Sequence, residues 1–237
     1  MGAGTVLVGV AGMIILFHTN RLSFKKISVG EIILTLKDGW PITGTNLSMN
    51  IIQYGNLFIL RLFTNDLVAG YFSVAERIYF AVKQMLVIFS QSVYPKACQI
   101  AAVGGMELKL FFKKVFRPFF YVVLAGSVAL FFLSPLIINF FADEHNDEAI
   151  FILRMFCIVL PIICLNIPGT LTLLAYNSRK KYFTVYFSAM LLCIIANIGL
   201  VQLFNINGTI AAIFLTELFI TIMASIFMYR LLRIRTA

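Results

Sequence analysis

One apolar stretch of the sequence carries charged side chains that could bind an anionic molecule. The segment Val68–Tyr94 contains Glu76, Arg77 and Lys83. At about 100° per residue along an α-helix, its polar side chains share a sector about 140° wide. These side chains are Ser73, Glu76, Arg77, Lys83, Gln84, Ser90, Gln91 and Tyr94. Because a charge inside a membrane helix is costly unless it is paired or hydrated, the pattern predicts a wet, positively charged cavity.

The preceding apolar stretch, Trp40–Phe63, has a similar polar sector that includes Arg61. Amides in such a sector could merely hydrogen-bond between packed helices, which contributes about 0.6–2 kcal/mol each. The charged residues favour a cavity shared by the two stretches. The predicted substrate-cavity residues are Asn46, Asn50, Gln53, Arg61, Arg77, Lys83, Gln84 and Gln91.

Two acidic residues in apolar stretches are candidates for coupling to a proton or a cation. Glu217 lies beside Thr216 in the last stretch, and Glu76 lies two turns before Lys83. An acid at such a depth is either neutral or paired. The alternative for Glu217 is a hydrogen-bonded packing residue, and Glu76 could instead pair with Lys83 through a neighbour.

The composition determines the class of protein that contains these residues. Of 237 residues, 61% are hydrophobic and only 12% are charged, and the mean hydropathy is +0.95. Soluble domains have about 25% charged residues, so an ordinary soluble enzyme and a nucleic-acid-binding protein are excluded. The sequence predicts an all-α integral membrane protein with about seven transmembrane helices. The predicted spans are Thr5–Phe17, Trp40–Phe63, Val68–Tyr94, Pro118–Phe141, Ala149–Tyr176, Tyr182–Phe204 and Thr209–Leu232.

The basic residues predict the orientation of these spans. Fifteen of the 19 Lys and Arg residues lie in alternate loops or in the C-terminal tail, and the intervening loops contain none. By the positive-inside rule, the C-terminus is cytoplasmic and the N-terminus lies outside. Because an outside start with no flanking charge is unusual, we expect the chain to be the later part of a longer protein. A genuine seven-span protein is the alternative.

Other charged and reactive residues show no pattern of a catalytic or metal site. The four cysteines lack ligand spacing, and neither a phosphate-binding loop nor a catalytic triad context occurs. No enzyme activity, cofactor or metal is therefore expected. Among the charged residues, Arg154 lies near an acidic outer loop, and its side chain is expected to extend towards the membrane surface. The phenylalanine-rich span Pro118–Phe141 is expected to face lipid.

Several motifs, taken in order, resemble the O-antigen and polysaccharide flippases of the multidrug/oligosaccharidyl-lipid/polysaccharide exporter superfamily. Residues Val68–Arg77 read VAGYFSVAER, and the same span closes on Val93–Lys96, VYPK. Asn166–Lys181 and Gly208–Thr221 resemble later spans of these proteins. Family members have twelve spans in two six-helix lobes. The resemblance therefore implies that residues 36–237 form the C-terminal lobe, preceded by one helix and a basic linker in residues 1–35.

The resemblance also implies a function. The implied substrate is a polysaccharide repeat unit linked to undecaprenyl pyrophosphate, which alternating access would move across the bacterial inner membrane. Implied partners are this lipid-linked oligosaccharide, membrane lipids, a polysaccharide polymerase and chain-length proteins. No nucleic-acid partner is expected. A cationic cavity suits a pyrophosphate, because Arg and Lys form charge-assisted hydrogen bonds with its oxygens. The alternatives are a drug exporter of the same superfamily and a membrane fragment that does not transport.

Overall fold

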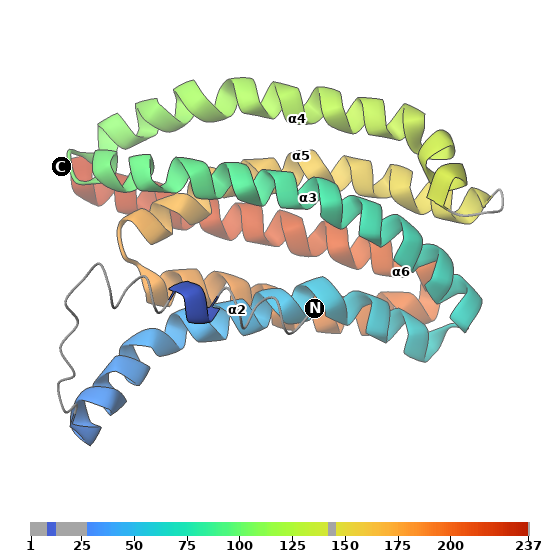
Figure 1. Cartoon of the computed structure of the whole chain (residues 1–237), viewed down its shortest axis with the longest axis horizontal. Helices are drawn as coiled ribbons and strands as arrows, with labels where there is room; N and C mark the ends of the chain where they lie inside the picture. Colours follow the sequence, from blue (N-terminus) through green and yellow to red (C-terminus); the bar gives the residue numbers. More distant parts are fainter. Residues whose placement is uncertain (1–8, 13–27, 142–145, 237) are drawn as a thin grey trace. The chain divides into compact units, whose positions relative to one another are not determined.

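A computed structural model describes residues 9–12, 28–141 and 146–236 of the chain (Figure 1). These residues contain no β-strand, which confirms the predicted all-α class. Besides a helical turn at residues 9–12, the elements are α2 (Val29–Phe63), α3 (Asp66–Ala101), α4 (Gly105–Phe141), α5 (Asp147–Ala175) and α6 (Arg179–Thr236). The chain divides into two compact units, Met1–Trp40 and Pro41–Ala237. The boundary lies inside α2 at Pro41, which lacks the amide hydrogen that continues a helix ladder.

Asparagine side chains begin two of the helices. The Oδ1 atom of Asn65 accepts a 2.9 Å hydrogen bond from the Val68 amide at the start of α3. The Oδ1 atom of Asn146 accepts one of 3.1 Å from the Ala149 amide at the start of α5. Both bonds satisfy amides that have no partner within the helix, so they fix where these helices begin.

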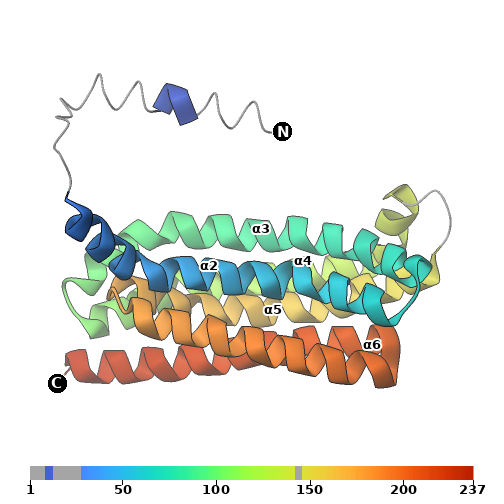
Figure 2. The same cartoon turned by 90° about the horizontal axis from the view of Figure 1, so that it is seen from below.

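The longest helix, α6, is two helices joined by a sharp kink. Asn205 has φ 50° and ψ −125°, values outside the helical region. The chain reverses there, so residues 179–204 and 206–236 run back along each other (Figure 2). Between residues 29 and 236, the described part of the chain thus contains six helical segments. Each overlaps one of the second to seventh predicted spans, but α2 and α4 begin more than ten residues earlier than predicted. The first, Thr5–Phe17, lies mostly outside the described residues.

Three helices are long and apolar enough to cross a membrane by length and composition alone. They are α4, α5 and residues Arg179–Arg233 of α6, within the described part of the chain. Polar and charged side chains lower the hydropathy of α2 and α3. The predicted total of seven spans therefore stays a prediction, whereas an apolar, all-helical membrane protein is confirmed.

The core of the second unit is built around α5. This helix packs against α3, α4 and α6, and Figure 1 shows it between α4 and the second half of α6. Phe156 of α5 is buried and meets the ring of Phe72 at a centroid distance of 5.5 Å. In contrast, α4 exposes large aromatic side chains such as Phe132 and Phe140. This exposure agrees with the expectation that residues 118–141 face lipid.

Gly208 allows the reversal in α6, and its replacement by alanine is expected to destabilise this hairpin. A Cβ atom at Gly208 would overlap the carbonyl of Leu200 and lie 2.8 Å from the amide nitrogen of Val201. Because backbone atoms cannot move aside cheaply, Gly208→Ala should lower the unfolding free energy by about 1–3 kcal/mol. Gly199→Ala is the matched control, since nothing lies within 4 Å of a Cβ there. Thermal unfolding of the purified variants tests this, and equal melting temperatures would contradict it.

Candidate functional site

Three helices bring one cation, one acid and one amide together inside the bundle. The Nζ atom of Lys83, in α3, lies 2.8 Å from Oε1 of Glu217 in the second half of α6. Asn166 of α5 donates a hydrogen bond of 3.3 Å from Nδ2 to the other carboxylate oxygen, Oε2. The Lys83 ammonium also lies 5.7 Å from the centre of the Tyr79 ring. The carboxylate is therefore held on both oxygens by groups from two other helices.

The ion pair differs from the interpretation that the sequence allowed. Lys83 was expected to contribute an excess positive charge or to pair with Glu76 through a neighbour. It pairs with Glu217 instead, because the two helices place these side chains face to face. Only 6% of the Glu217 side chain is exposed, against 24% of that of Lys83. The cation thus retains access to the space beside it.

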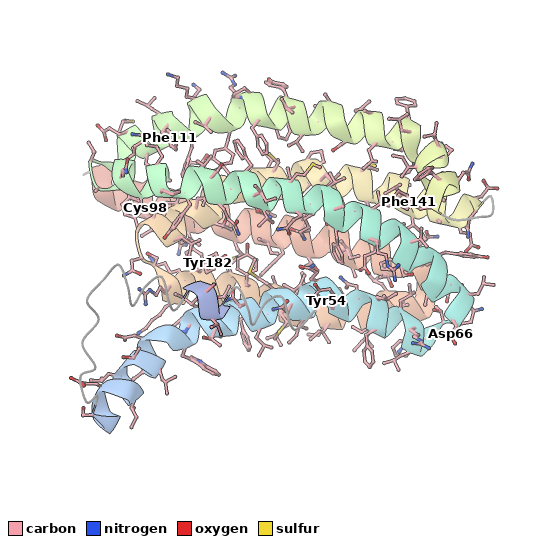
Figure 3. All side chains as sticks on the ribbon, viewed as in Figure 1. Tyr54, Asp66, Cys98, Phe111, Phe141 and Tyr182 are labelled. Carbon is pink, nitrogen blue, oxygen red and sulfur yellow. The ribbon has the colours of Figure 1, made fainter. Side chains whose placement is uncertain are left out.

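A cavity of about 430 Å³ adjoins the ion pair. Four helices line it, and the predicted residues Asn46, Gln53, Lys83, Gln91 and Glu217 all contribute. Its other polar or aromatic lining residues are Ser90, Tyr94, Asn166, Thr170, Tyr182 and Tyr186. Tyr182, labelled in Figure 3, belongs to the end of the bundle that also contains Cys98, whereas Asp66 lies at the opposite end. The cavity therefore extends from the ion pair towards the end where α6 begins.

A second, much smaller cavity places Glu76 near the same ion pair. It measures about 20 Å³, and its lining includes Gln53, Asn56, Glu76, Lys83 and Glu217. This volume is enough for about one water molecule, and the polar lining offers such a molecule several partners. Glu76 itself is buried. Both candidate coupling acids consequently lie beside Lys83.

Four of the predicted cavity residues line neither of these two cavities. Arg61 forms an exposed ion pair with Asp66, with 2.7 Å between Nε and Oδ1. Asn50 donates a hydrogen bond of 2.8 Å to the Asn46 carbonyl, and Arg77 and Gln84 are exposed. Only one edge of the polar sector of α3, the edge with Glu76 and Lys83, faces α5 and α6. Substrate binding by these four residues stays a prediction.

Arg154 does not simply extend towards the surface as expected. Its Nε atom donates a hydrogen bond of 3.1 Å to Oγ of Ser134, in the neighbouring helix α4. Its guanidinium lies 5.2 Å from the centre of the Phe131 ring. A hydroxyl and an aromatic face on α4 therefore satisfy this half-buried charge within the protein.

A buried amide network, which the sequence did not reveal, ties α2 to both halves of α6. Asn56 Oδ1 accepts hydrogen bonds from Asn197 Nδ2 at 2.8 Å and from Cys193 Sγ at 3.3 Å. Thr209, beyond the kink, donates from Oγ1 to Asn197 Oδ1 at 3.1 Å. Asn197 had no recognisable signal, because a single asparagine in an apolar span shows no periodic pattern. The network fixes the wall of the cavity that α2 provides.

Comparisons with known proteins show which family the chain resembles. A family model described as "Polysaccharide biosynthesis protein" matches residues 2–100. A protein of Escherichia coli (strain K12) named "Putative O-antigen transporter" is 20% identical over 220 residues. A protein of the same name from Shigella dysenteriae is 21% identical over 217 residues. The resemblance to the polysaccharide and O-antigen flippase family is confirmed.

The flippase family is a family of membrane transporters, which agrees with the apolar helices of this chain. The two matches cover 92% and 90% of this chain but 53% and 54% of the relatives. The chain thus spans about half the length of the curated relatives it matches. No solved structure matches it significantly.

Proposed function

We propose that the chain takes part in moving lipid-linked polysaccharide repeat units across the bacterial inner membrane by alternating access. Residues 36–237 would act as one six-helix lobe of the transporter. The observation that carries the proposal is the cavity of about 430 Å³ inside an apolar bundle, with Lys83 at its end. Family resemblance supports the substrate class, an oligosaccharide on an undecaprenyl pyrophosphate carrier. A polysaccharide polymerase and chain-length proteins would act on the same material after transport.

In this proposal Lys83 receives the pyrophosphate. An ammonium group provides three donors, and phosphate oxygens form short charge-assisted hydrogen bonds with it. The tyrosines, amides and hydroxyls of the cavity can hydrogen-bond the sugar hydroxyls. The apolar carrier remains in the bilayer, so only the polar head needs the cavity.

Glu217 then serves as the group that couples transport to a proton. A pyrophosphate bound to Lys83 competes with the carboxylate for the same ammonium. Once Lys83 is engaged, Glu217 retains the hydrogen bond from Asn166 but has lost the cation that balanced its charge. Proton uptake by Glu217 would thereby accompany loading of the anionic substrate. Other titratable groups around this acid are Glu76 and Tyr79 of α3 and Tyr186 and Cys193 of α6.

The proposed function is tested by transport of a fluorescent pyrophosphate-linked oligosaccharide in vesicles that contain the intact protein. We expect movement of the labelled head group between leaflets, and competition by unlabelled pyrophosphate-linked oligosaccharide but not by cationic dyes. Transport of cationic dyes alone would instead identify a drug exporter. Absence of both activities from folded protein in the membrane would contradict a role in transport.

Orientation in the membrane provides a separate prediction. A reporter fused after Ala237 is expected to be active in the cytoplasm, and one inserted at Asn146 should report the periplasm. The physical reason is the excess of Lys and Arg in the loops on one side. The helices α5 and the two halves of α6 place an odd number of spans between Asn146 and Ala237, so the two reporters should lie on opposite sides. If both give the same side, the number of spans between them is even and the prediction is wrong.

A further inference from the structure

The first turns of α4 present a cluster of positive charges on the outside of the bundle. Lys109, Lys113, Lys114 and Arg117 are all exposed. On the opposite side of the same turns, Leu108, Phe112 and Phe116 are buried in the core. Burial of these apolar side chains fixes the rotation of the helix, so the cations must point outward. Nitrogen-bearing side chains project from α4 near Phe111 in Figure 3.

This basic face of α4 (Lys109, Lys113, Lys114 and Arg117) has no acidic partner among the described residues. None of its four cations takes part in an ion pair within the part of the chain that the structure describes. The acidic residue of the same turns, Glu107, has its carboxylate against Gly104 instead. Three of the cations, together with Leu110 and Pro118, line a surface hollow of about 350 Å³. Uncompensated positive charges around a concave surface create a potential that attracts an anion.

An exposed apolar stripe continues from the basic face along the same side of α4. With Lys113 as origin and about 100° per residue, Arg117 lies near 40° and Lys114 near 100°. Exposed apolar side chains further along the helix lie within about the same range, between 20° and 100°. They are Tyr121, Leu124, Val128 and Phe132. A molecule bound at the cations would therefore have an apolar surface next to it, on the exposed side of α4.

We propose that the basic face of α4 and this stripe together bind an anionic glycerophospholipid. The phosphate lies against Lys113, Lys114 and Arg117, and an acyl chain lies along Leu124, Val128 and Phe132. Lys and Arg at the end of an apolar span are the groups that recognise anionic head groups. A free phosphate would use the cations but not the stripe. This site does not depend on the proposed transport function, because α4 does not line the cavity beside Lys83.

Native mass spectrometry of the purified full chain, with added phosphatidylglycerol or phosphatidylcholine, tests the proposal. We expect the wild-type protein to prefer phosphatidylglycerol by about tenfold or more. The triple variant Lys113→Gln, Lys114→Gln, Arg117→Gln should lose this preference. The matched control is Lys180→Gln, Lys181→Gln, Arg230→Gln, which removes the same charge from exposed or half-exposed positions elsewhere. Retained preference in this control supports a site on α4, and an equal loss in both variants overturns it.

Two further arms separate lipid from other sources of phosphate. Val128→Ser with Phe132→Ser should weaken binding of phosphatidylglycerol while binding of glycerol 3-phosphate stays weak and unchanged. If glycerol 3-phosphate binds as tightly as the lipid, the site is a phosphate site and the proposal is wrong. Preference for a polyprenyl phosphate over phosphatidylglycerol would equally overturn it. Unaltered thermal unfolding of each variant, measured beforehand, excludes misfolding as the cause of a loss.

Discussion

Replacement of Lys83 by alanine is expected to reduce transport of the pyrophosphate-linked substrate by about 100-fold or more. The proposed substrate would lose its charged partner at the end of the cavity, and truncating one member of a buried charge pair typically costs about 2–5 kcal/mol or more, of which about 2.8 kcal/mol already corresponds to 100-fold. The measurement is initial flipping rate per molecule of protein in vesicles. Arg77→Ala is the comparison, because Arg77 is a cation on the same helix but is exposed. A similar loss there would support the sequence-based assignment of Arg77 to the substrate cavity.

Loss of stability could mimic this result, because Lys83→Ala leaves Glu217 buried without its cation. Breaking a buried ion pair by removing one partner is strongly destabilising, whereas removing both charges is often tolerated. The double variant Lys83→Met, Glu217→Gln should therefore restore abundance in the membrane without restoring transport. Wild-type flipping by the double variant would show that the ion pair is structural and that Lys83 does not bind substrate.

Glu217→Gln is expected to slow transport by about tenfold or more and to abolish its response to an imposed pH gradient. Glutamine keeps the shape of the side chain and can still accept the hydrogen bond from Asn166, but it cannot take up a proton. The variant also loses the charged bond between Lys83 and the Glu217 carboxylate, and a hydrogen bond to a charged group contributes about 1.5–3 kcal/mol. Because Lys83 is then free of its competitor, binding of inorganic pyrophosphate should become tighter rather than weaker. Isothermal titration and flipping under a pH gradient measure the two effects.

Glu76→Gln is the matched control for Glu217→Gln. Glu76 is also a buried acid near Lys83, but it is not the carboxylate that pairs with it. Its replacement should leave the pH response largely intact. A lost pH response in Glu76→Gln with an intact one in Glu217→Gln would assign the coupling role to Glu76. An unchanged rate and pH response in Glu217→Gln would reduce Glu217 to a packing residue.

The sequence predicted which segments of the second unit are helical, although α4 begins at Gly105, well before the predicted Pro118, and α3 continues past Tyr94 to Ala101. Charged or asparagine-containing breaks between the apolar runs separate each helix from the next. The Asn65 and Asn146 caps and the break at Asn205 fall in the loops that separate the predicted spans. These features are local, since a helix boundary depends on residues within about one turn of it. The polar sector of α3 is also a local feature, because it follows from the rotation of about 100° per residue along a single helix.

The partners across the cavity were decided only by the tertiary structure. Periodicity shows that Lys83 and Arg77 share a polar sector, but it cannot tell which edge of that sector meets another helix. Glu217 lies 134 residues after Lys83, and Asn197 lies 141 residues after Asn56. Which of these side chains meet depends on how α3, α5 and the two halves of α6 rotate to bury residues such as Phe72 and Phe156. The packing of the core therefore determines that Lys83 pairs with Glu217 and that Arg77 is exposed.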